Sequence, residues 1–379
     1  MKVLFWLNTF LPDVGGIQTL CERLIPELQG LGHEILLLTA YTPGATPDHV
    51  MYNDQIEVWR VDSLRPLLQQ NPGGMLRAKQ RITRIIEDFD PDLIHIHPCG
   101  PELSYYLLTQ AKRPLPTLVT VHNNYSRVGL SFGQTTSFGR ALRSAERVTA
   151  VSDEARRWLL SEAPELTAKT STVHNGIPLA PIEVAPLSWD PPTVLWAGRV
   201  EPQKRLDVLL TAFVDVAAQH GQARLRIVGG GTQLEAMRAL AASLGIADRV
   251  DFTGRVEPDA VPAMFNESTL FALSSDYEGL PMVALEAAQF GRPMVCTDAG
   301  GTAEAVIPGE TGLVVDPGNP AALAAALLEL LGDRTKTEQF GAAARRFIEQ
   351  SFSLRACAEA YQRLYAEVLE EARARQVVA

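Results

Sequence analysis

The strongest constraint on the fold of this 379-residue chain is an alternation of short aliphatic runs with longer segments of helical periodicity. Alternation of this kind predicts βα units and parallel sheets. In the first half the predicted helices include 17–30, 75–88 and 153–162. The predicted strands of the same half are 3–8, 34–40, 56–61, 92–97, 116–122, 147–152 and 170–175. We therefore predict an open α/β sheet for this half.

A proline-rich segment then interrupts the pattern. Residues 178–192, PLAPIEVAPLSWDPP, have no periodicity and predict a linker. Beyond it the alternation restarts, with predicted strands at 193–198, 223–229, 249–254, 270–275, 293–298 and 312–316. Predicted helices here include 205–219, 232–243 and 282–290, and from about 319 onward the chain is predicted to be helical. The expected organisation is a first domain at 1–177, a linker at 178–192, a second domain at 193–352 and a C-terminal helix at 353–379.

Composition narrows the class of protein. With 46% hydrophobic and 21% charged residues the chain can bury a large core, which excludes a disordered or fibrous protein. The N-terminal apolar run after Lys2 predicts a buried strand instead of a signal peptide, and no apolar run is long enough to span a membrane. The four cysteines, Cys21, Cys99, Cys296 and Cys357, lie far apart and support neither a disulfide framework nor a zinc site. We expect a cytoplasmic protein, with the inner face of the membrane as a second location.

The net charge of −10 argues against a general nucleic-acid-binding protein. Basic residues nevertheless gather in two places in the first half. The first group is Arg77, Lys79, Arg81 and Arg84, and the second is Arg127, Arg140, Arg143 and Arg147. Each group is either a solvated face or a surface for a phosphate-bearing or lipid-linked acceptor.

Two glycine-rich turns follow predicted strands. In LPDVGGI, Gly15 and Gly16 precede the first helix, where free N–H groups favour an anion; a purely structural turn is the alternative. In VGGGTQL, Gly229 and Gly231 resemble a dinucleotide fingerprint, but Leu234 stands where a third glycine is expected. Because this unit begins inside the second domain, we do not predict NAD binding.

Charged residues stand in two further loops of the second half. In WAGRVEPQKRLD, Arg199 and Lys204 straddle a strand-to-helix loop, where they would neutralise a diphosphate or remain solvated surface charges. In EGLPMVALEA, Glu278 precedes a helix and Glu286 lies within it. A carboxylate among apolar helix residues needs a partner, which is either an ion pair or the hydroxyls of a ligand. Paired carboxylates also suggest a glycosidase, but the neighbouring glycine-rich and basic loops favour phosphate as the partner.

Histidines close two strands of the first half. His122 ends the fifth predicted strand, at the edge where an α/β sheet binds ligands, and has either a structural or a functional role. His95 and His97 share one face of the preceding strand, but no third ligand is near in sequence. No metal site is predicted.

The order and spacing of GGI, VH, GRVEPQK, VGGG, EGLPMVALEA and TDAGGTAEAV resemble those of the family 4 retaining glycosyltransferases of the GT-B fold. The resemblance covers essentially the whole chain and is strongest over 196–317. It implies two Rossmann-like domains with parallel sheets that face each other across a cleft. The second domain would bind a nucleotide-sugar donor and the first an acceptor, and the C-terminal helix would return to the first domain.

The resemblance also implies roles for individual residues. Arg199 and Lys204 match the diphosphate-binding pair, and Gly16, next to Gly15, matches the glycine whose N–H meets the donor phosphate. His122 matches the histidine that lies over the transferred sugar. The remaining matches are Glu278 with the sugar hydroxyls, the N–H groups of Gly279 and Leu280 near them, Glu286 with the ribose, Gly229 in the glycine-rich turn, and Arg255 and Val256 around the base. The catalytic candidates are His122, Arg199, Lys204 and Glu278.

The resulting expectation is a retaining hexosyltransferase that uses no cofactor and no metal. A UDP-sugar is slightly preferred to GDP-mannose as donor, and the acceptor is a hydroxyl of a glycan, a lipid-linked sugar or a small molecule. No nucleic-acid partner is expected, whereas peripheral membrane contact through the first domain is an option. The alternatives are a sugar-nucleotide epimerase of the same fold, which needs no acceptor, and a non-catalytic sugar-binding protein.

Overall fold

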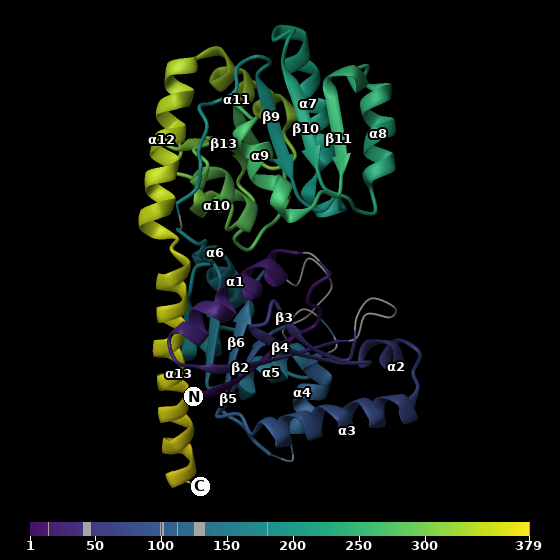
Figure 1. Ribbon diagram of the computed structural model, residues 1–379, viewed down its shortest axis with the longest axis vertical. Helices are drawn as coiled ribbons and strands as arrows, with labels where there is room; N and C mark the ends of the chain where they lie inside the picture. The colour runs from purple at the N-terminus through teal and green to yellow at the C-terminus, as the bar shows by residue number, and fades with distance from the viewer. Residues whose placement is uncertain are drawn as a thin grey trace. The chain divides into compact units, whose positions relative to one another are not determined.

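A computed structural model describes residues 1–13, 15–40, 47–98, 100, 102–111, 113–124, 133–179 and 181–378. The chain forms two compact units: Met1–Gly176 together with Leu354–Ala379, and Ile177–Ser353. Each unit is a sheet flanked by helices (Figure 1). The predicted α/β class, with parallel sheets in two Rossmann-like domains, is confirmed.

The first unit contains an eight-stranded sheet in the order β3-β4-β2-β1-β5-β6-β7-β8. Its strands are β1 (Lys2–Leu7), β2 (Glu34–Ala40), β3 (His49–Tyr52), β4 (Ile56–Val61), β5 (Leu93–His97), β6 (Thr117–Val121), β7 (Arg147–Ala150) and β8 (Thr170–Thr172). Every neighbouring pair is parallel except β3 with β4. Because β1, β5 and β6 are neighbours, the loops that follow them leave the same edge of the sheet.

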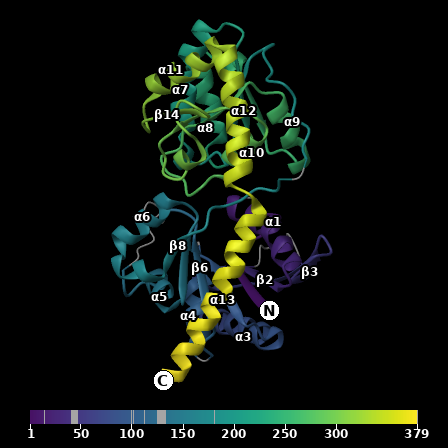
Figure 2. The ribbon, with the colours of Figure 1, turned by 90° about the vertical axis from the view of Figure 1, so that its left-hand side faces the viewer.

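The helices of this unit follow the strands of the βα pattern. They are α1 (Gly16–Gly30), α2 (Leu64–Leu68), α3 (Pro72–Phe89), α4 (Glu102–Gln110), α5 (Ser137–Ser144), α6 (Asp153–Glu162), the 3₁₀ turn η2 (Pro164–Lys169) and α13 (Leu354–Val378). Local capping fixes several starts: Asn71 accepts a hydrogen bond from Gly74 N, and Ser152 accepts one from Ala155 N. The C-terminal helix α13 packs beside α1 and against β5 and β6 (Figure 2). Its side chains Tyr361 and Tyr365 are fully buried.

The second unit contains a parallel six-stranded sheet in the order β11-β10-β9-β12-β13-β14. Its strands are β9 (Thr193–Ala197), β10 (Arg224–Val228), β11 (Val250–Gly254), β12 (Leu270–Leu273), β13 (Met294–Thr297) and β14 (Gly312–Val315). Its helices are α7 (Leu206–Gln219), α8 (Leu234–Ser243), α9 (Val261–Asn266), α10 (Met282–Gln289), α11 (Pro320–Gly332) and α12 (Arg334–Ser351). Short 3₁₀ turns stand at η3 (Pro202–Lys204), η4 (Ala247–Arg249), η5 (Pro258–Ala260) and η6 (Ala303–Ala305).

The predicted linker is a fixed part of the second unit. The backbone N–H of Ala185 donates to Asn266 Oδ1 at 2.9 Å, and its carbonyl accepts from Arg292 Nη2 at 2.7 Å. Gln289 Nε2 donates to the carbonyl of Pro178 at 2.6 Å. The prolines prevent regular structure here, but these polar side chains of the second unit satisfy the backbone of the segment. The predicted linker at 178–192 thus has no helix or regular strand among its described residues, and these hydrogen bonds attach it to the second unit.

Two classes of element were missed from the sequence. The edge strand β3 has the sequence HVMY and no buried residue, so it lacks an apolar run. The short helices α2 and α9 each bury a single side chain, Pro66 and Phe265, which is too little for a periodic signal.

The structure describes three of the four cysteines and most of the helices of the chain. Cys21, Cys296 and Cys357 are buried and form no disulfide, while Cys99 lies outside the described residues. Within the described residues, no helix is both long and apolar enough to cross a membrane.

Candidate active site

The carboxyl edge of the second sheet brings Lys204 and Glu278 into contact. Lys204 ends η3 after β9, and Glu278 lies in the loop after the neighbouring strand β12. Lys204 Nζ donates to Glu278 Oε1 at 2.5 Å, with side chains only 15% and 10% exposed. Ser275 Oγ donates to the same carboxylate oxygen at 2.7 Å. The lysine predicted to hold a diphosphate and the glutamate predicted to hold sugar hydroxyls thus form one ion pair.

The loop that carries Lys204 has a left-handed residue at its end. Arg205 has φ 44°, and it separates η3 from α7. Its guanidinium bonds Asp207 Oδ2 at 3.0 Å and Asp276 Oδ1 at 3.0 Å. Left-handed backbone is costly for a non-glycine residue, so these two carboxylates hold the turn that positions Lys204. Arg205 and Asp276 were not predicted from the sequence, because neither belongs to a recognisable spacing.

The glycine-rich turn after β10 packs directly on the loop after β9. A Cβ at Gly229, where φ is +128°, would lie 1.9 Å from the carbonyl oxygen of Gly198. A Cβ at Gly231 would lie 2.3 Å from the Val200 carbonyl oxygen. The N–H of Gly229 donates to the Gly254 carbonyl at 2.8 Å and is not available to a phosphate. Gly229 therefore acts on this edge through close packing, which fixes the loop that carries Arg199.

A second contact holds the two loops together. Glu201 accepts hydrogen bonds from the N–H of Thr232 at 3.1 Å and from its Oγ1 at 2.6 Å. The hydrogen bond from the Thr232 side chain lowers the pKa of the Glu201 carboxyl. The charged Glu201 carboxylate therefore keeps the glycine-rich turn attached to the loop after β9.

Two exposed arginines stand at this edge without an ion-pair partner in the described part of the chain. Arg199 follows β9, and Arg255 follows β11, two strands away in the sheet. The side chain of Arg255 lies over Gly230, where a Cβ would meet Arg255 Cγ at 3.2 Å. Unpaired guanidinium groups of this kind are suited to phosphate oxygens.

The remaining candidates of the second unit lie after β11 and in or just before α10. Gly279 and Leu280 are buried and precede Pro281, the N-cap of α10, and Val256 is half-buried after β11. Gly279 N–H donates to no acceptor among the described residues. Glu286 lies in the middle of α10 and is half-buried among apolar neighbours. The loop and the helix place both a free N–H and a carboxylate within one short segment.

In the first unit, the loop after β1 leads to an uncapped helix start. Gly15 precedes α1, and a Cβ there would lie 2.5 Å from Gln18 Oε1, the end of a flexible side chain that could move aside. A Cβ at Gly16 would meet nothing within 4 Å. No side chain caps the helix, and its first turn has no acidic residue. This N-terminus therefore offers free N–H groups and positive potential to an anion.

His122 follows β6 at the same edge of the first sheet and is 8% exposed. Its Nε2 lies 2.7 Å from Nδ1 of the buried His97. Burial lowers the pKa of His122 to about 3, so the ring is neutral at neutral pH. The structure thus brings His122 together with His97, for which the sequence had suggested only a metal-binding role.

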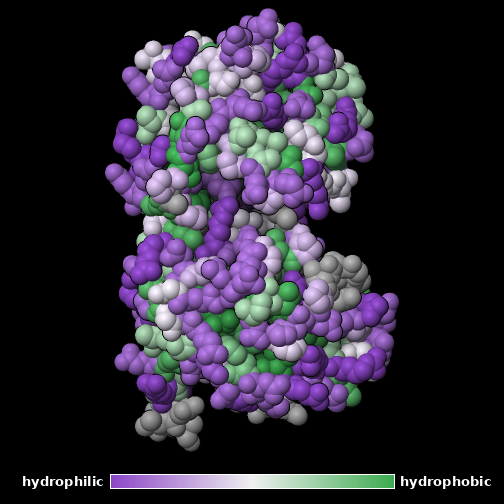
Figure 3. All heavy atoms as spheres, viewed as in Figure 1, coloured by the Kyte–Doolittle hydropathy of each residue, from purple (hydrophilic) through white to green (hydrophobic). Residues whose placement is uncertain are grey.

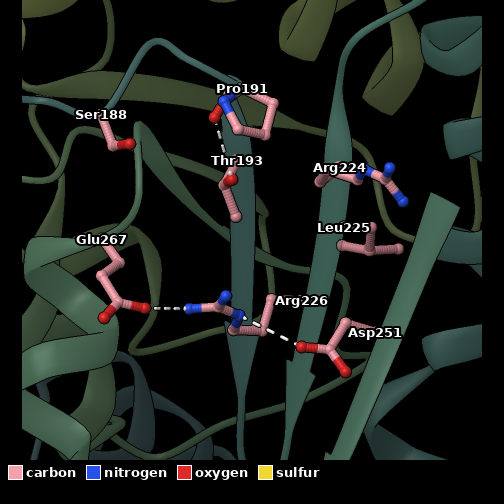
Figure 4. Close-up of a pocket in the computed structure, with 8 residues that line it drawn as sticks. All are labelled: Ser188, Pro191, Thr193, Arg224, Leu225, Arg226, Asp251 and Glu267. Atoms are coloured by element: carbon pink, nitrogen blue, oxygen red, sulfur yellow. Dashed lines mark hydrogen bonds and ion pairs between the residues drawn. The ribbon is translucent and has the colours of Figure 1, made fainter.

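Two pockets in the second unit are lined partly by charged side chains. One, of about 340 Å³, lies at the amino ends of β9 and β10, where Arg226 is bound by both Glu267 and Asp251 (Figure 4). Arg226 is already neutralised by these two carboxylates, and the pocket is at the opposite edge of the sheet from Lys204. The other, of about 710 Å³, borders the Lys204 loop and is lined by Pro202, Gln203, Arg205, Asp207, Gln233, Met237, Asp276 and Tyr277.

The comparisons with known proteins agree with this arrangement. Residues 14–180 match the family "Glycosyltransferase Family 4", and residues 182–347 match "Glycosyl transferases group 1". Together the two matches cover nearly the whole chain, and the solved structures it resembles are glycosyltransferases of the GT-B fold. The chain belongs to the family 4 glycosyltransferases.

Particular relatives are similar over different lengths. The chain is 28% identical to a GDP-mannose-dependent alpha-mannosyltransferase of Mycolicibacterium smegmatis, over 92% of each protein. It is 40% identical to a GDP-mannose-dependent alpha-(1-6)-phosphatidylinositol monomannoside mannosyltransferase of Mycobacterium tuberculosis, over 41% of this chain and 43% of the relative. A structure of Anabaena HepE in complex with UDP-glucose matches with a TM-score of 0.79 and 22% identity, over 98% of this chain and 100% of HepE.

Proposed function

We propose that this glycosyltransferase moves a hexose from a nucleoside diphosphate sugar to a hydroxyl group, with retention of the anomeric configuration and without a divalent metal. The observation that carries the proposal is the cationic edge of the second sheet. There Arg199 is exposed and unpaired among the described residues, and Lys204 is held beside Glu278 by a bond of 2.5 Å. A diphosphate needs such positive charge, and an adjacent carboxylate can accept bonds from sugar hydroxyls.

In the proposed reaction the bond from the anomeric carbon to the donor phosphate breaks, and a bond from that carbon to the acceptor oxygen forms. Negative charge grows on the leaving diphosphate, where Arg199 and Lys204 stabilise it. The acceptor's proton passes to an oxygen of the departing phosphate. His122, with a pKa of about 3, is too weak a base to take that proton near neutral pH.

The other proposed roles concern binding. Glu278, with the N–H groups of Gly279 and Leu280, contacts hydroxyls of the transferred sugar. Glu286 accepts from the ribose hydroxyls, and Arg255 with Val256 frames the base. In the first unit, the N–H groups at the start of α1, beginning with Gly16, are suited to bind a phosphate. The support for these roles is the position of each residue after a strand or at a helix start, together with the family membership.

Metal independence and retention are tested in one assay. Transfer should continue in excess EDTA, because Arg199 and Lys204 supply the charge that a metal would otherwise provide. The product's anomeric coupling, measured by NMR, should match the donor's configuration. Without acceptor the donor sugar should keep its stereochemistry, whereas an epimerase would convert it. Loss of activity that magnesium restores, or an inverted product, contradicts the proposal.

For the donor we propose GDP-mannose, which replaces the sequence-based preference for a UDP-sugar. Two relatives reported above are named as GDP-mannose-dependent, whereas HepE, found with UDP-glucose, is similar only at 22% identity. GDP at 100 times its dissociation constant should stabilise the protein by about 2.7 kcal/mol, seen as a rise in melting temperature. UDP at the same concentration should shift it little. A larger shift with UDP would return the assignment to a UDP-sugar.

We also propose that the first unit contacts an anionic membrane surface, where a lipid-linked acceptor would be found. Leu68 and Leu76 are 74% and 55% exposed on α2 and α3. Arg77, Lys79 and Arg84 of α3 have no ion-pair partner among the residues described. Figure 3 shows a mainly hydrophilic surface with scattered hydrophobic residues. Uncompensated cations beside exposed leucines fit a membrane that carries negative lipids.

The second basic group is compensated only in part, because Arg140 is exposed and has no ion-pair partner among the described residues. Arg143 pairs with Glu165, and Arg147 pairs with Glu367 and Glu371. Arg127 lies outside the described residues. The positive charge of Arg143 and Arg147 is therefore compensated by neighbouring carboxylates.

Co-sedimentation with vesicles tests the membrane proposal. The protein should bind vesicles that contain phosphatidylglycerol more strongly than vesicles of phosphatidylcholine alone. The triple variant Arg77→Glu, Lys79→Glu and Arg84→Glu should lose this preference, because each cation contributes about 1 kcal/mol near the surface. The matched control changes the exposed cations Arg346, Arg363 and Arg373 to Glu. Equal loss in both triple variants would show only an effect of net charge and would overturn the proposal.

A further inference from the structure

Three histidines in the first unit form a continuous buried cluster. His122 Nε2 lies 2.7 Å from His97 Nδ1, and the ring centroids of His97 and His95 are 4.2 Å apart. His95 bonds Thr120 Oγ1 at 2.7 Å and the hydroxyl of Tyr365, on α13, at 2.8 Å. The side chains of His95 and His97 are fully buried, while His122 is 8% exposed. The cluster therefore has one end at the edge of the sheet and the other in the core.

All three rings are neutral. Burial lowers the pKa of His95 and His97 well below the ordinary value, and lowers that of His122 to about 3. No carboxylate bonds any of the three rings in the described structure. A hydrogen bond between two neutral imidazoles requires one N–H and one bare nitrogen. The bond between His97 and His122 thus has only two arrangements.

The environment of His97 Nε2 distinguishes these arrangements. This nitrogen is buried and has no hydrogen-bond partner among the described residues. If His122 donated to His97 Nδ1, the proton of His97 would be on Nε2, as an unpaired N–H in the core. If His97 donates through Nδ1, only a bare lone pair is left there. Orphaned buried donors are rarer in proteins than under-satisfied acceptors, so the second arrangement is favoured.

We propose that His97 is a positioning residue that fixes His122 as its Nδ1–H tautomer by donating its own Nδ1–H to His122 Nε2. With Nε2 occupied in this way, the ring meets a ligand through Nδ1, as a hydrogen-bond donor. Its partner is then an oxygen with a lone pair, such as a hydroxyl of the transferred sugar. This last assignment rests on the proposed function, whereas the tautomer itself does not.

The tautomer is measured by NMR on the full chain labelled with ¹⁵N in its histidines, with His122→Gln used to assign the signals. His122 should show a protonated Nδ1 and a bare Nε2, which have well-separated ¹⁵N shifts. In His97→Leu the Nε2 of His122 loses its donor. The ring should then return to the mixture, dominated by Nε2–H, of a free imidazole. A protonated Nε2 of His122 in the unmodified protein overturns the proposal, whatever the activity of the variants.

Kinetics supply the second readout. His97→Leu should lower kcat by about tenfold, the worth of one hydrogen bond, with KM for the donor within a few-fold. His97→Asn keeps an N–H donor near the position of Nδ1 and should restore most of the rate. Tyr365→Phe is the matched control, because it removes a buried hydrogen bond of the same cluster without touching His122. An equal loss of kcat in His97→Asn and His97→Leu would indicate packing alone and overturn the positioning role.

The two proposals fail differently. If His122→Ala retains full transfer activity while NMR finds the predicted tautomer, the catalytic assignment of His122 is wrong and the tautomer stands. If His122→Ala is inactive and the tautomer is Nε2–H, the proposed function stands and the role of His97 is wrong.

Discussion

Replacing Arg199 or Lys204 by alanine is expected to lower kcat/KM for sugar transfer by about 10²- to 10³-fold, which is typical of losing one group that stabilises charge in a transition state. The two variants should nevertheless differ in stability. Arg199 is exposed and unpaired in the described structure, so its loss should change the free energy of unfolding by less than about 0.5 kcal/mol. Lys204 is paired with a largely buried Glu278, so its loss should cost about 1–3 kcal/mol.

A double-mutant cycle separates these two effects of Lys204. In Lys204→Ala with Glu278→Ala no carboxylate is left without its cation, and unfolding in urea should recover much of the lost stability. Activity should not recover. If activity returned with stability, the ion pair would have only a structural role.

Binding measurements identify which part of the donor each residue contacts. In calorimetry, Arg199→Ala and Lys204→Ala should weaken binding of the nucleoside diphosphate but leave the nucleoside nearly unaffected. Glu286→Ala is the contrasting variant, because a ribose contact should affect both ligands equally, by roughly 5- to 150-fold. Equal losses for both ligands in Arg199→Ala would contradict its assignment to the diphosphate.

Arg292→Met is expected to destabilise the second unit by about 2–4 kcal/mol, which is the largest effect on folding that we predict. The guanidinium is fully buried and has no carboxylate partner in the described structure. It donates to the carbonyls of Ser268 at 3.1 Å and Ala185 at 2.7 Å, and to Asn266 Oδ1 at 3.2 Å. A methionine of similar length would remove all three hydrogen bonds, leave the Ala185 carbonyl without a donor among the described residues, and loosen the segment before β9.

The burial of Arg292 limits the size of this effect. Desolvation lowers its pKa to about 10, which shows that the charge is already costly where it lies. Removing the charge recovers part of that cost. The expected loss in the free energy of unfolding is therefore smaller than the summed contributions of the hydrogen bonds that Arg292 makes. The control is Arg346→Met on α12, an exposed arginine of the same unit, which should change the midpoint of urea unfolding little. Equal midpoints for the two variants would show that the buried contacts contribute nothing net.

The periodicity of the sequence predicted both sheets, because an apolar run of strand length followed by an amphipathic segment is a local property of the chain. It also placed Gly16, His122, Arg199, Lys204 and Glu278 in loops or at helix starts after strands. Positions that follow strands lie at the carboxyl edge of a sheet, which is where parallel sheets bind ligands. Elements with a weak local signal, such as the exposed strand β3, were not predicted.

Only the tertiary structure decided which side chains meet. Lys204 and Glu278 are 74 residues apart in sequence and touch because β9 and β12 are neighbours in the sheet, an order that no local pattern specifies. Likewise Arg292 bonds Ala185 from 107 residues away and attaches the predicted linker to the second unit. The sequence by itself determined the elements and their chemistry, since these depend on neighbouring residues. Pairing, burial and the tautomer proposed for His122 depend on strand order and long-range packing, which are properties of the folded chain alone.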